Sequence, residues 1–526
     1  MTLTKHLLLA GIAIGLPTPA VHAADYYVSP AQPGAVAGAP LAAISLQATV
    51  NIKRFVSQTV GGKTVGKWII VGQTTVNNSA TTPTAPTAPS KTSETAPSTG
   101  STGTSTTGTS TTGTSTTGTS TTGTSGSTAP APQTGSTYPS LGALLQSGRV
   151  TGGDRIFLLA GSHGPLNIKD VNFTAPVTIA EMPGQTAQVD AIQIVNSSNL
   201  VFQNLSVWAT SPNAGNSPVI RSYGGAHDLT FTNLDVRSAA DAGTYVGWNL
   251  ATWNAHKRGG FLVDGNNIKV IGNRVTGTYF ALFALGNNAL VQNNIIDGWA
   301  GDAMRVTGNG STVRGNKAQN CFHIDANHDD GLQAASAAPG GWGSGTLDSV
   351  TIENNKIYEW NATQTNALRC KLQGIGMFDG QYSNIVIRNN VIAVSNWHGI
   401  AVAGGHHVTI SENTVVNPRG IVGDAPWIKI AASKTGVAPT DVMVANNTTN
   451  AVKVVANTTN RVATANNIVV KNFLTEFTAP AQQNYTLLPT AQSANAAAIA
   501  YATKTDILGV PRPKGKGPDA GAYESQ

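Results

Sequence analysis

The sequence predicts an all-β solenoid, in which short strands are stacked in successive coils along one axis. One short phrase recurs between residues 199 and 450, most plainly from Asn384 to Ile392 and from His407 to Val416. Apolar and polar residues alternate inside each copy, as in a strand with one buried face. The copies lie roughly 20 to 40 residues apart, the period of repeat proteins whose units bury their apolar faces by stacking.

An asparagine ends most copies of the phrase, where the chain has to turn. Such residues are Asn204, Asn233, Asn273, Asn294, Asn355 and Asn447. Asparagine tolerates the left-handed backbone conformation of a tight turn better than most residues do. Asparagines at equivalent positions of stacked coils can also hydrogen-bond to one another along the axis. We therefore expect left-handed turns and an asparagine ladder.

The first 23 residues predict a secretory signal peptide. Lys5 precedes an apolar run from Leu7 to Leu16, and Ala23 closes a sequence suited to cleavage. The apolar run is too short to cross a membrane. We therefore expect a secreted or periplasmic protein without a membrane span.

The rest of the chain divides by composition. Residues 24–76 are expected to form an N-terminal strand or small segment, which either pairs with the solenoid or folds as a module of its own. Residues 77–137 are rich in Thr, Ser, Gly and Pro and predict a flexible linker. The solenoid is expected over residues 138–480, and residues 481–526 form a closing segment.

Four segments together carry a family resemblance: the recurring phrase, the start Asp25 to Pro30, the Gly153-Asp154-Arg155-Ile156 strand, and the closing stretch from Asp506 to Glu524. The chain resembles the right-handed parallel β-helix proteins of the pectate-lyase-like superfamily from about Ser140 to Glu524. The resemblance implies an all-β, right-handed parallel β-helix with an N-terminal capping helix from Pro139 to Gly148.

Composition limits the classes of partner. Only 11% of residues are charged and the formal net charge is +6, which suits an extracellular protein with an acidic partner. The spacing of Cys and His predicts no zinc site, and neither a phosphate loop nor a nucleic-acid module is present. Cys321 and Cys370 form either one disulfide or two buried thiols. A capped solenoid needs no partner for solubility, so we expect a monomer.

Aligning the strands that precede each phrase gives columns of residues that neighbour one another in space, about 4.8 Å apart. One outward column, here called the outer row, is Leu262, Phe283, Arg305, Gln333, Gly376, Ala401 and Lys429. Two positions before the central apolar residue the column is Gly259, Phe280, Asp302, Asp330, Gln373, His398 and Pro426. Polar groups concentrate between Asp302 and His398, which predicts the location of a site.

The densest cluster of titratable residues runs from Cys321 to Gln333, where two histidines and three aspartates fall within one turn. Such clustering is typical of functional sites. The alternative is a structural turn whose Asp and Asn side chains bond to their own backbone.

The superfamily resemblance implies a polysaccharide lyase that acts on a uronate-containing polysaccharide. In such enzymes a base removes the C5 proton, and positive charge or calcium neutralises the neighbouring carboxylate. Lys371 and His328 are the candidate bases and Arg305 the candidate positive charge, with Asp330 as a further catalytic residue. Asp302 and Asp329 are the predicted Ca²⁺ ligands. The residues expected to contact substrate are Gln333, His398, Lys257, Arg258 and Trp397.

Two other functions remain open. Asp302 and Asp330 are one coil apart in one column, so a β-helix glycoside hydrolase or an epimerase using paired aspartates is an alternative. Neither the Arg-Pro pattern of pectate lyases nor the Asp-Pro-His-Asp signature of alginate C5-epimerases is present, so the lyase hypothesis comes from the superfamily alone. A non-catalytic glycan-binding or adhesion protein is the third possibility, since tryptophans such as Trp342, Trp397 and Trp427 can stack on sugar rings.

Overall fold

The computed structural model describes residues 23–30, 48–60, 63–76, 136–210, 217–421 and 423–525. The chain separates into two compact units, one of residues 1–31 and 129–526 and the other of residues 32–128. Apart from Ala23, Ser136 and Thr137, the predicted signal peptide and linker lie outside the described residues.

The N-terminal segment 24–76 contributes to both units. Strand β1 (Asp25–Val28) pairs in parallel with β5 (Arg155–Leu158) and so belongs to the solenoid. Strands β2 (Ala48–Val60) and β3 (Lys63–Val76) pair with each other as an antiparallel hairpin in the second unit.

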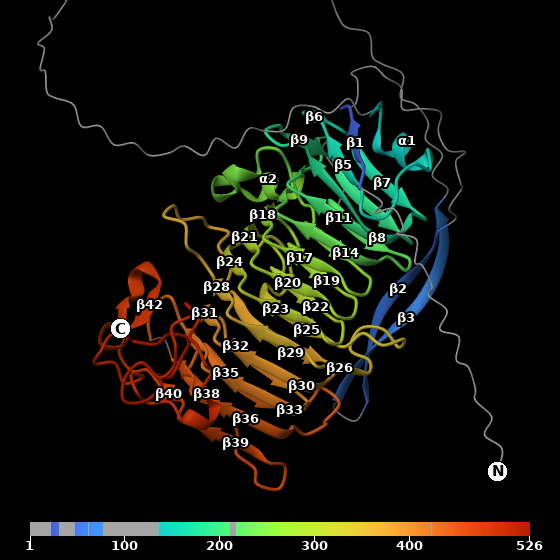
Figure 1. Ribbon diagram of the computed structural model, residues 1–526. Coiled ribbons are helices and arrows are strands. Elements are labelled where there is room, and N and C mark those ends of the chain that lie inside the picture. The colour runs from blue at the N-terminus through green and yellow to red at the C-terminus, as the bar shows by residue number, and fades with distance from the viewer. Residues whose placement is uncertain are drawn as a thin grey trace, which may run out of the picture. The chain divides into compact units, whose positions relative to one another are not determined.

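Three parallel sheets make up the solenoid, and each full coil contributes one strand to each sheet (Figure 1). Sheet 1 contains β1, β4 (Thr137–Tyr138), β5, β8 (Asn172–Glu181), β11 (Ser198–Gln203), β14 (His227–Thr232), β17 (Lys269–Ile271), β20 (Leu290–Gln292), β23 (Thr312–Arg314), β26 (Thr346–Asp348), β27 (Thr351–Glu353), β30 (Gln381–Arg388), β33 (Gly405–Ser411), β36 (Thr440–Ala445) and β39 (Val462–Ala465). Sheet 2 contains β7 (Pro165–Lys169), β10 (Ala191–Val195), β13 (Ile220–Tyr223), β16 (Phe261–Val263), β19 (Leu282–Ala284), β22 (Met304–Val306), β25 (Asp330–Ala335), β29 (Gln373–Asp379), β32 (His398–Ala403), β35 (Trp427–Ala431) and β38 (Ala451–Lys453). Sheet 3 contains β6 (Gly161–Ser162), β9 (Ala187–Val189), β12 (Ser206–Val207), β15 (Asp235–Arg237), β18 (Arg274–Thr278), β21 (Ile295–Trp299), β24 (Lys317–Cys321), β28 (Lys356–Tyr358), β31 (Val391–Ala393), β34 (Thr414–Val416), β37 (Thr448–Thr449) and β40 (Ile468–Val469).

The helices of the described residues are short. They are α1 (Leu141–Gln146), η1 (Ala242–Gly247), α2 (Leu250–Ala255), α3 (Phe473–Glu476), η2 (Pro480–Gln482) and η3 (Ile499–Tyr501). Helix α1 lies where the capping helix is expected, and its Leu141 and Leu144 pack into the solenoid core. Its function as a cap remains a prediction.

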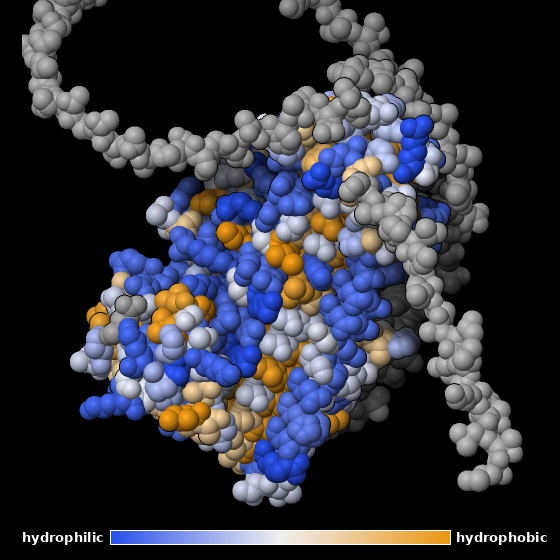
Figure 2. Space-filling model, in the orientation of Figure 1, coloured by the Kyte–Doolittle hydropathy of each residue, from blue (hydrophilic) through white to orange (hydrophobic). Residues whose placement is uncertain are grey.

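Alternation along each strand puts every second side chain into the interior. In β14, Leu229 and Phe231 are fully buried, whereas the residues between and beside them are partly exposed. Phe231 stacks on Phe202 of the preceding coil, with ring centroids 5.4 Å apart. Burying one such side chain contributes roughly 1.5–3 kcal/mol. On the visible face, apolar side chains form an interrupted band beside hydrophilic ones (Figure 2).

The predicted left-handed turns are confirmed at Asn204 and Asn233, whereas in four other copies the left-handed residue lies one position before the predicted asparagine, at Gly272, Asn293, Asn354 and Asn446. Asn204, Asn233 and Asn354, for example, have φ values of 58°, 54° and 57°. The asparagine ladder is confirmed as well, because each member after Asn273 accepts hydrogen bonds from the backbone and side chain of the member one coil before it. The buried ladder consists of Asn273, Asn294, Asn316, Asn355, Asn390, Asn413 and Asn447, and it continues to Asn467.

Substituting one ladder residue is expected to lower stability. The Asn316 side chain donates to Val291 O and to Asn355 Oδ1, both at 2.9 Å, and accepts two bonds from Asn294. Asn316→Ala leaves buried groups of both neighbours unpaired, so we expect a loss of about 3–5 kcal/mol. The melting temperature measured by circular dichroism checks this, with the exposed Asn167→Ala as the matched control. Equal melting temperatures for the two variants would show that the ladder adds nothing.

The closing segment packs against the turns of several coils. Asn389 Nδ2 donates to Thr505 O at 2.9 Å, and Asn446 Nδ2 donates to Ala498 O at 3.0 Å. The antiparallel strands β41 (Phe477–Ala479) and β42 (Asn484–Leu487) contribute Phe477 and Leu487 to a second apolar core. The last coils are thereby covered by the chain itself.

Candidate functional site

The outer row exists as predicted. Strand pairing aligns Leu262 with Phe283, Phe283 with Arg305, and Arg305 with Gln333. The row continues from Gln333 through Gly376 and Ala401 to Lys429. Residues far apart in sequence are therefore neighbours on the outer face of sheet 2.

The second column is confirmed from Asp302 to Gln373 and wrong at its end. Asp330 N–H donates to Asp302 Oδ1 at 3.2 Å, and Asp330 pairs with Gln373. His398, however, pairs with Trp427 and not with Pro426, because the register shifts between His398 and Ile400. The shift brings an aromatic ring, instead of a proline, beside the histidine.

Arg305 is held in place by a carboxylate and by aromatic rings. Its Nη2 forms an ion pair with Asp302 Oδ2. Its guanidinium carbon lies 4.5 Å from the ring centroid of Phe283 and 4.9 Å from that of Trp342. Such cation–π contacts add roughly 0.5–2 kcal/mol each. The positive charge at the centre of the outer row therefore has a defined position.

The three aspartates around Arg305 are buried. Burial raises the pKa of Asp302, and the charge of Arg305 opposes that rise. Burial and the neighbouring Asp302 raise the pKa of Asp330 well above its ordinary value. Burial, with the charges of Asp302 and Asp325, raises the pKa of Asp329 to about 8. Burial therefore favours the protonated form of Asp329 and Asp330, whereas the positive charge of Arg305 works against protonation of Asp302.

Three buried side-chain oxygens near Arg305 have no hydrogen-bond partner among the described residues: Asp329 Oδ1, Asp330 Oδ1 and Gln333 Oε1. Asp329 Oδ2, by contrast, lies 2.7 Å from His323 Nδ1. Leaving a buried polar atom unpaired costs about 1–3 kcal/mol. These buried oxygens therefore have unused hydrogen-bonding capacity.

Lys371 and His328 lie at one edge of sheet 2, just before two strands of neighbouring coils. Gln373 N–H donates to Asp329 O at 3.0 Å, which joins the two coils at this point. Both side chains are exposed. Within the described ranges, neither the Lys371 amino group nor the His328 ring has a hydrogen-bond or ion-pair partner.

Lys257 and Arg258 come from the loop before β16. Lys257 Nζ lies 2.7 Å from Asp325 Oδ2 and 4.2 Å from the Tyr279 ring centroid. Tyr279 Oη donates to the same carboxylate at 2.7 Å. Burial lowers the pKa of Arg258, whose carbonyl accepts from Tyr279 N–H. The charge of Lys257 is therefore balanced inside the protein.

His398 and Trp397 border an aromatic part of the face. Trp427 Nε1 donates to His398 Nδ1 at 3.3 Å, and the Trp397 ring stacks on Trp427 with centroids 6.0 Å apart. Trp397 is 62% exposed. Burial, together with Lys429, lowers the pKa of His398, which favours the neutral ring. A cavity of about 250 Å³ lies beside it, lined by Phe378, His398, Ala401, Lys429, Ser433 and Lys434.

Sequence reasoning missed Asp379 and Lys434. Asp379 Oδ2 accepts from Trp342 Nε1 at 3.1 Å, and Oδ1 pairs with Lys434 at 2.5 Å. Asp379 therefore holds the ring that covers Arg305. A single aspartate at the end of a strand gave no signal of this, because its partners lie 37 and 55 residues away.

Cys321 and Cys370 form a disulfide, with Sγ atoms 2.09 Å apart. It links β24 to the segment that carries Lys371. The Asp329 carboxylate lies within 4.8 Å of both sulfurs. Both sulfurs belong to the disulfide, so of the two alternatives left open by the sequence the structure has the disulfide and not two buried thiols.

Replacing Asp329 is expected to change how stability depends on pH. The folded pKa of about 8 exceeds the ordinary value of 3.8. The stability contribution of this carboxyl is therefore full below about pH 4 and is lost as the pH rises towards 8. In the wild type, we expect the free energy of unfolding to fall by on the order of 3 kcal/mol between pH 5 and pH 8 because of this carboxyl. Asp329→Asn should remove that part of the fall, and the melting temperatures at the two pH values measure it. The exposed Asp424→Asn is the control, and equal falls in all three proteins would contradict the prediction.

The described residues include no helix long and apolar enough to cross a membrane.

A family model described as "Right handed beta helix region" matches residues 259–423. The protein is a right-handed parallel β-helix. The matched part of this β-helix contains the outer row from Leu262 to Ala401 and both candidate bases.

Three solved structures resemble this β-helix. A PL6 family alginate lyase is 14% identical, with a TM-score of 0.34, and the match covers 59% of the present chain and 47% of the lyase. A pectate lyase is 15% identical, with a TM-score of 0.37 and coverage of 74% and 92%. The A-module of a mannuronan C-5 epimerase from Azotobacter vinelandii is 12% identical, with a TM-score of 0.39 and coverage of 62% and 88%.

The β-helix thus spans about half the length of the alginate lyase. No curated protein matches its sequence. At these identities and TM-scores, the likenesses establish no activity.

Proposed function

We propose that the protein is a secreted enzyme that cleaves an acidic, uronate-containing polysaccharide by β-elimination at the outer face of sheet 2. The supporting observation is which of its basic side chains are held in ion pairs and which are not. Arg305, Lys257 and Lys434 are each held in an ion pair. In the part of the chain that the structure describes, Lys371 and His328 are exposed without such a partner, so they are available to act on a substrate.

In β-elimination a base takes the C5 proton, and the released electron pair forms the C4=C5 double bond. The C4–O bond breaks, and the leaving oxygen takes up a proton. The C5 proton is acidic enough only when positive charge neutralises the neighbouring carboxylate. We assign proton abstraction to Lys371, with His328 as the second candidate base, and the neutralising charge to Arg305.

Asp330 is the candidate donor of the proton to the leaving oxygen. Burial and the charge of Asp302 raise its pKa well above the ordinary value, which favours the protonated carboxyl. A retained proton is what a general acid requires. Asp302 then acts as a positioning residue, because it pairs with Arg305 and accepts from Asp330 N–H.

Calcium remains a proposed cofactor. Asp329 and Asp330 each have one buried oxygen without a hydrogen-bond partner among the described residues, and carboxylate oxygens are ligands that Ca²⁺ prefers. The oxygens of Asp302 already accept from Arg305, Asn327 and Asp330. Asp329 is therefore the residue that would hold the ion, in its ionised form, since Asp330 is assigned the retained proton; the ion would supply further positive charge to the substrate carboxylate.

Hydrolysis is the second candidate reaction, and one observation favours it. Asp302 is paired with Arg305, whereas the pKa of the neighbouring Asp330 is raised. An ionised carboxylate beside a protonated one is the arrangement that glycoside hydrolases use. This reaction needs neither Lys371 nor His328.

Secretion is proposed from the apolar N-terminal run and from the disulfide, since disulfides persist in oxidising compartments. The monomeric state remains a prediction.

The test is an assay of the purified protein on pectate, alginate and a neutral glycan, with calcium and with a chelator. Ultraviolet absorbance reports the unsaturated ends that elimination creates, and a reducing-end assay reports every cleavage. We expect both signals to rise together on an acidic polysaccharide. Reducing ends without absorbance would replace elimination by hydrolysis, and binding without either signal would leave epimerisation, which NMR of the polysaccharide detects, or a binding function.

A further inference from the structure

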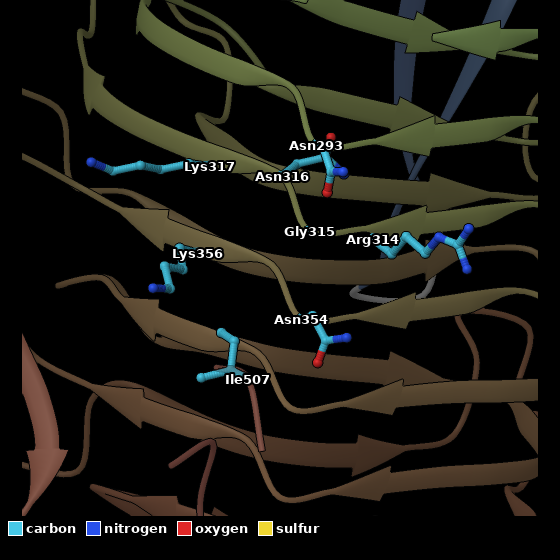
Figure 3. A pocket seen from close by; sticks show the side chains of 8 residues that line it. All are labelled: Asn293, Arg314, Gly315, Asn316, Lys317, Asn354, Lys356 and Ile507. Carbon is cyan, nitrogen blue, oxygen red and sulfur yellow. The ribbon is translucent and has the colours of Figure 1, made fainter. Parts of the chain in front are cut away.

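A basic pocket lies away from the outer row, at the turns between sheets 1 and 3 (Figure 3). Its volume is about 410 Å³, within the range of small-ligand sites. The residues that define it are Arg314, Gly315, Lys317, Asn354, Lys356 and Ile507. Lys317 and Lys356 extend from neighbouring strands to the same side, whereas Arg314 extends to the other side (Figure 3).

The two lysines are direct neighbours without a neutralising partner. Lys317 of β24 pairs with Lys356 of β28 in the parallel ladder. Like charges in this arrangement destabilise a sheet. No salt bridge or hydrogen bond joins either amino group to another described residue. Burial and the charge of Lys317 lower the pKa of Lys356.

The carboxylate that acts on Lys356 electrostatically is Asp506, and its oxygens are already used. Asp506 Oδ1 accepts from Leu508 N–H at 2.7 Å and from Val510 N–H at 2.8 Å, and Oδ2 accepts from Glu524 N–H at 3.0 Å. Arg314 is bound to the neutral Gln292, at 2.8 and 2.9 Å. The pocket therefore retains positive charge that an anion can satisfy.

The rest of the pocket suits a sugar ring. The Asn293 and Asn354 side-chain amides form no hydrogen bond with other described residues, and Asn354 Oδ1 is buried without a partner. Amides of this kind can bond to hydroxyl groups. Ile507 supplies an apolar wall. Gly315 has a left-handed φ of 66°, and a Cβ atom there would lie 2.2 Å from Asn293 Oδ1, so the glycine leaves room for the Asn293 side chain.

We propose that this pocket binds a carboxylate-bearing sugar through Lys317 and Lys356, as a second binding site for an acidic polysaccharide. The choice of a uronate as the anion rests on the proposed function. A free inorganic anion such as phosphate also carries negative charge that can pair with the two lysines. The test distinguishes phosphate from a uronate. The site holds substrate without reacting with it.

Residue-resolved lysine labelling tests the proposal on the full chain. An amine-reactive ester is applied with a uronate trisaccharide, a neutral trisaccharide or inorganic phosphate, and labelling is read by mass spectrometry. We expect the uronate trisaccharide to slow labelling of Lys317 and Lys356 about fivefold or more, and the neutral sugar to have no effect. Protection by phosphate without protection by the uronate would overturn the assignment to a sugar.

The same experiment distinguishes failure of this second site from failure of the proposed active site. Protection of Lys371 and Lys429 alone would overturn the second site and leave the proposed function standing. Protection of Lys317 and Lys356 by the uronate, in a protein without cleavage activity, would support the second site and count against the proposed function.

A paired variant adds a binding measurement. Lys317→Met with Lys356→Met should weaken binding of the trisaccharide at this site about tenfold and leave turnover unchanged. Lys269→Met with Lys504→Met removes two exposed charges elsewhere and is the matched control, with circular dichroism as the check on folding. Equal affinity in the two double variants would refute the second site.

Discussion

Replacing Lys371 by methionine is expected to lower the turnover of an acidic polysaccharide by about 10²- to 10⁴-fold, the range for loss of a general base. Methionine keeps the length of the side chain and removes the amino group. Because the Lys371 amino group has no partner among the described residues, its loss should leave the melting temperature unchanged. The measurement is the initial rate of absorbance increase, with substrate both below and above KM.

Arginine at the same position separates charge from proton transfer. Lys371→Arg retains the positive charge and cannot serve as a base near neutral pH, because its pKa exceeds 12. We expect Lys371→Arg to be nearly as inactive as Lys371→Met. Activity retained in the arginine variant would reduce Lys371 to a binding residue. If the methionine variant were also active, His328→Asn would be the next substitution, and loss of activity there would move the base to His328.

A large effect on stability is also expected at Arg512. Its side chain is fully buried, and so are those of Glu412 and Glu524. Arg512 Nη1 lies 3.1 Å from Glu524 Oε2 and 3.8 Å from Glu412 Oε1, and Nη2 donates to Gly521 O at 2.7 Å. Arg512→Met leaves two buried carboxylates without their counter-charge, so we expect a loss of about 3–5 kcal/mol.

The loss should depend on pH in a definite direction. Burial already raises the pKa values of Glu412 and Glu524, and Arg512 opposes both rises. Removing Arg512 raises the two pKa values further, so the variant should lose more stability as the pH rises above the ordinary value of 4.5. Melting temperatures at pH 5 and pH 8 check this, with the exposed Lys514→Met as control. A larger deficit at pH 5 would contradict the explanation, whereas partial rescue by Glu524→Gln would support it.

The strand register could be predicted because small residues mark it. At Gly260 a Cβ atom would lie 2.4 Å from Ala281 O, and at Gly374 one would lie 2.1 Å from Gly399 O. The coils from Gly260 to Gly399 therefore have glycine or alanine at this position, immediately before the first apolar residue of the strand. The alignment is wrong at Pro426, because no residue pattern announces the shift between His398 and Ile400.

The contacts between loops were beyond sequence reasoning. Trp342 reaches Arg305 from an insertion, and Asp379 and Lys434 hold that insertion from later coils. Lys257 is bound to Asp325, 68 residues further along the chain. Such contacts depend on how a loop folds back, and no periodicity encodes them. The candidate residues of the outer row were found, and Asp302 and Trp342 were found with other roles, whereas Asp379 and Lys434 were not found.

The stacking of coils also determines how this molecule can change in length. Every coil in sheet 2 pairs only with the coil before it and the coil after it. The candidate active site involves the coils from β19 to β35, so the coils from β7 to β13 do not contact its central residues. Duplicating or deleting one of those earlier coils would therefore lengthen or shorten the surface that a polymer can follow, while the reacting groups keep their geometry. Under the proposed function, the length of the polysaccharide-binding surface and the reaction chemistry can thus evolve independently.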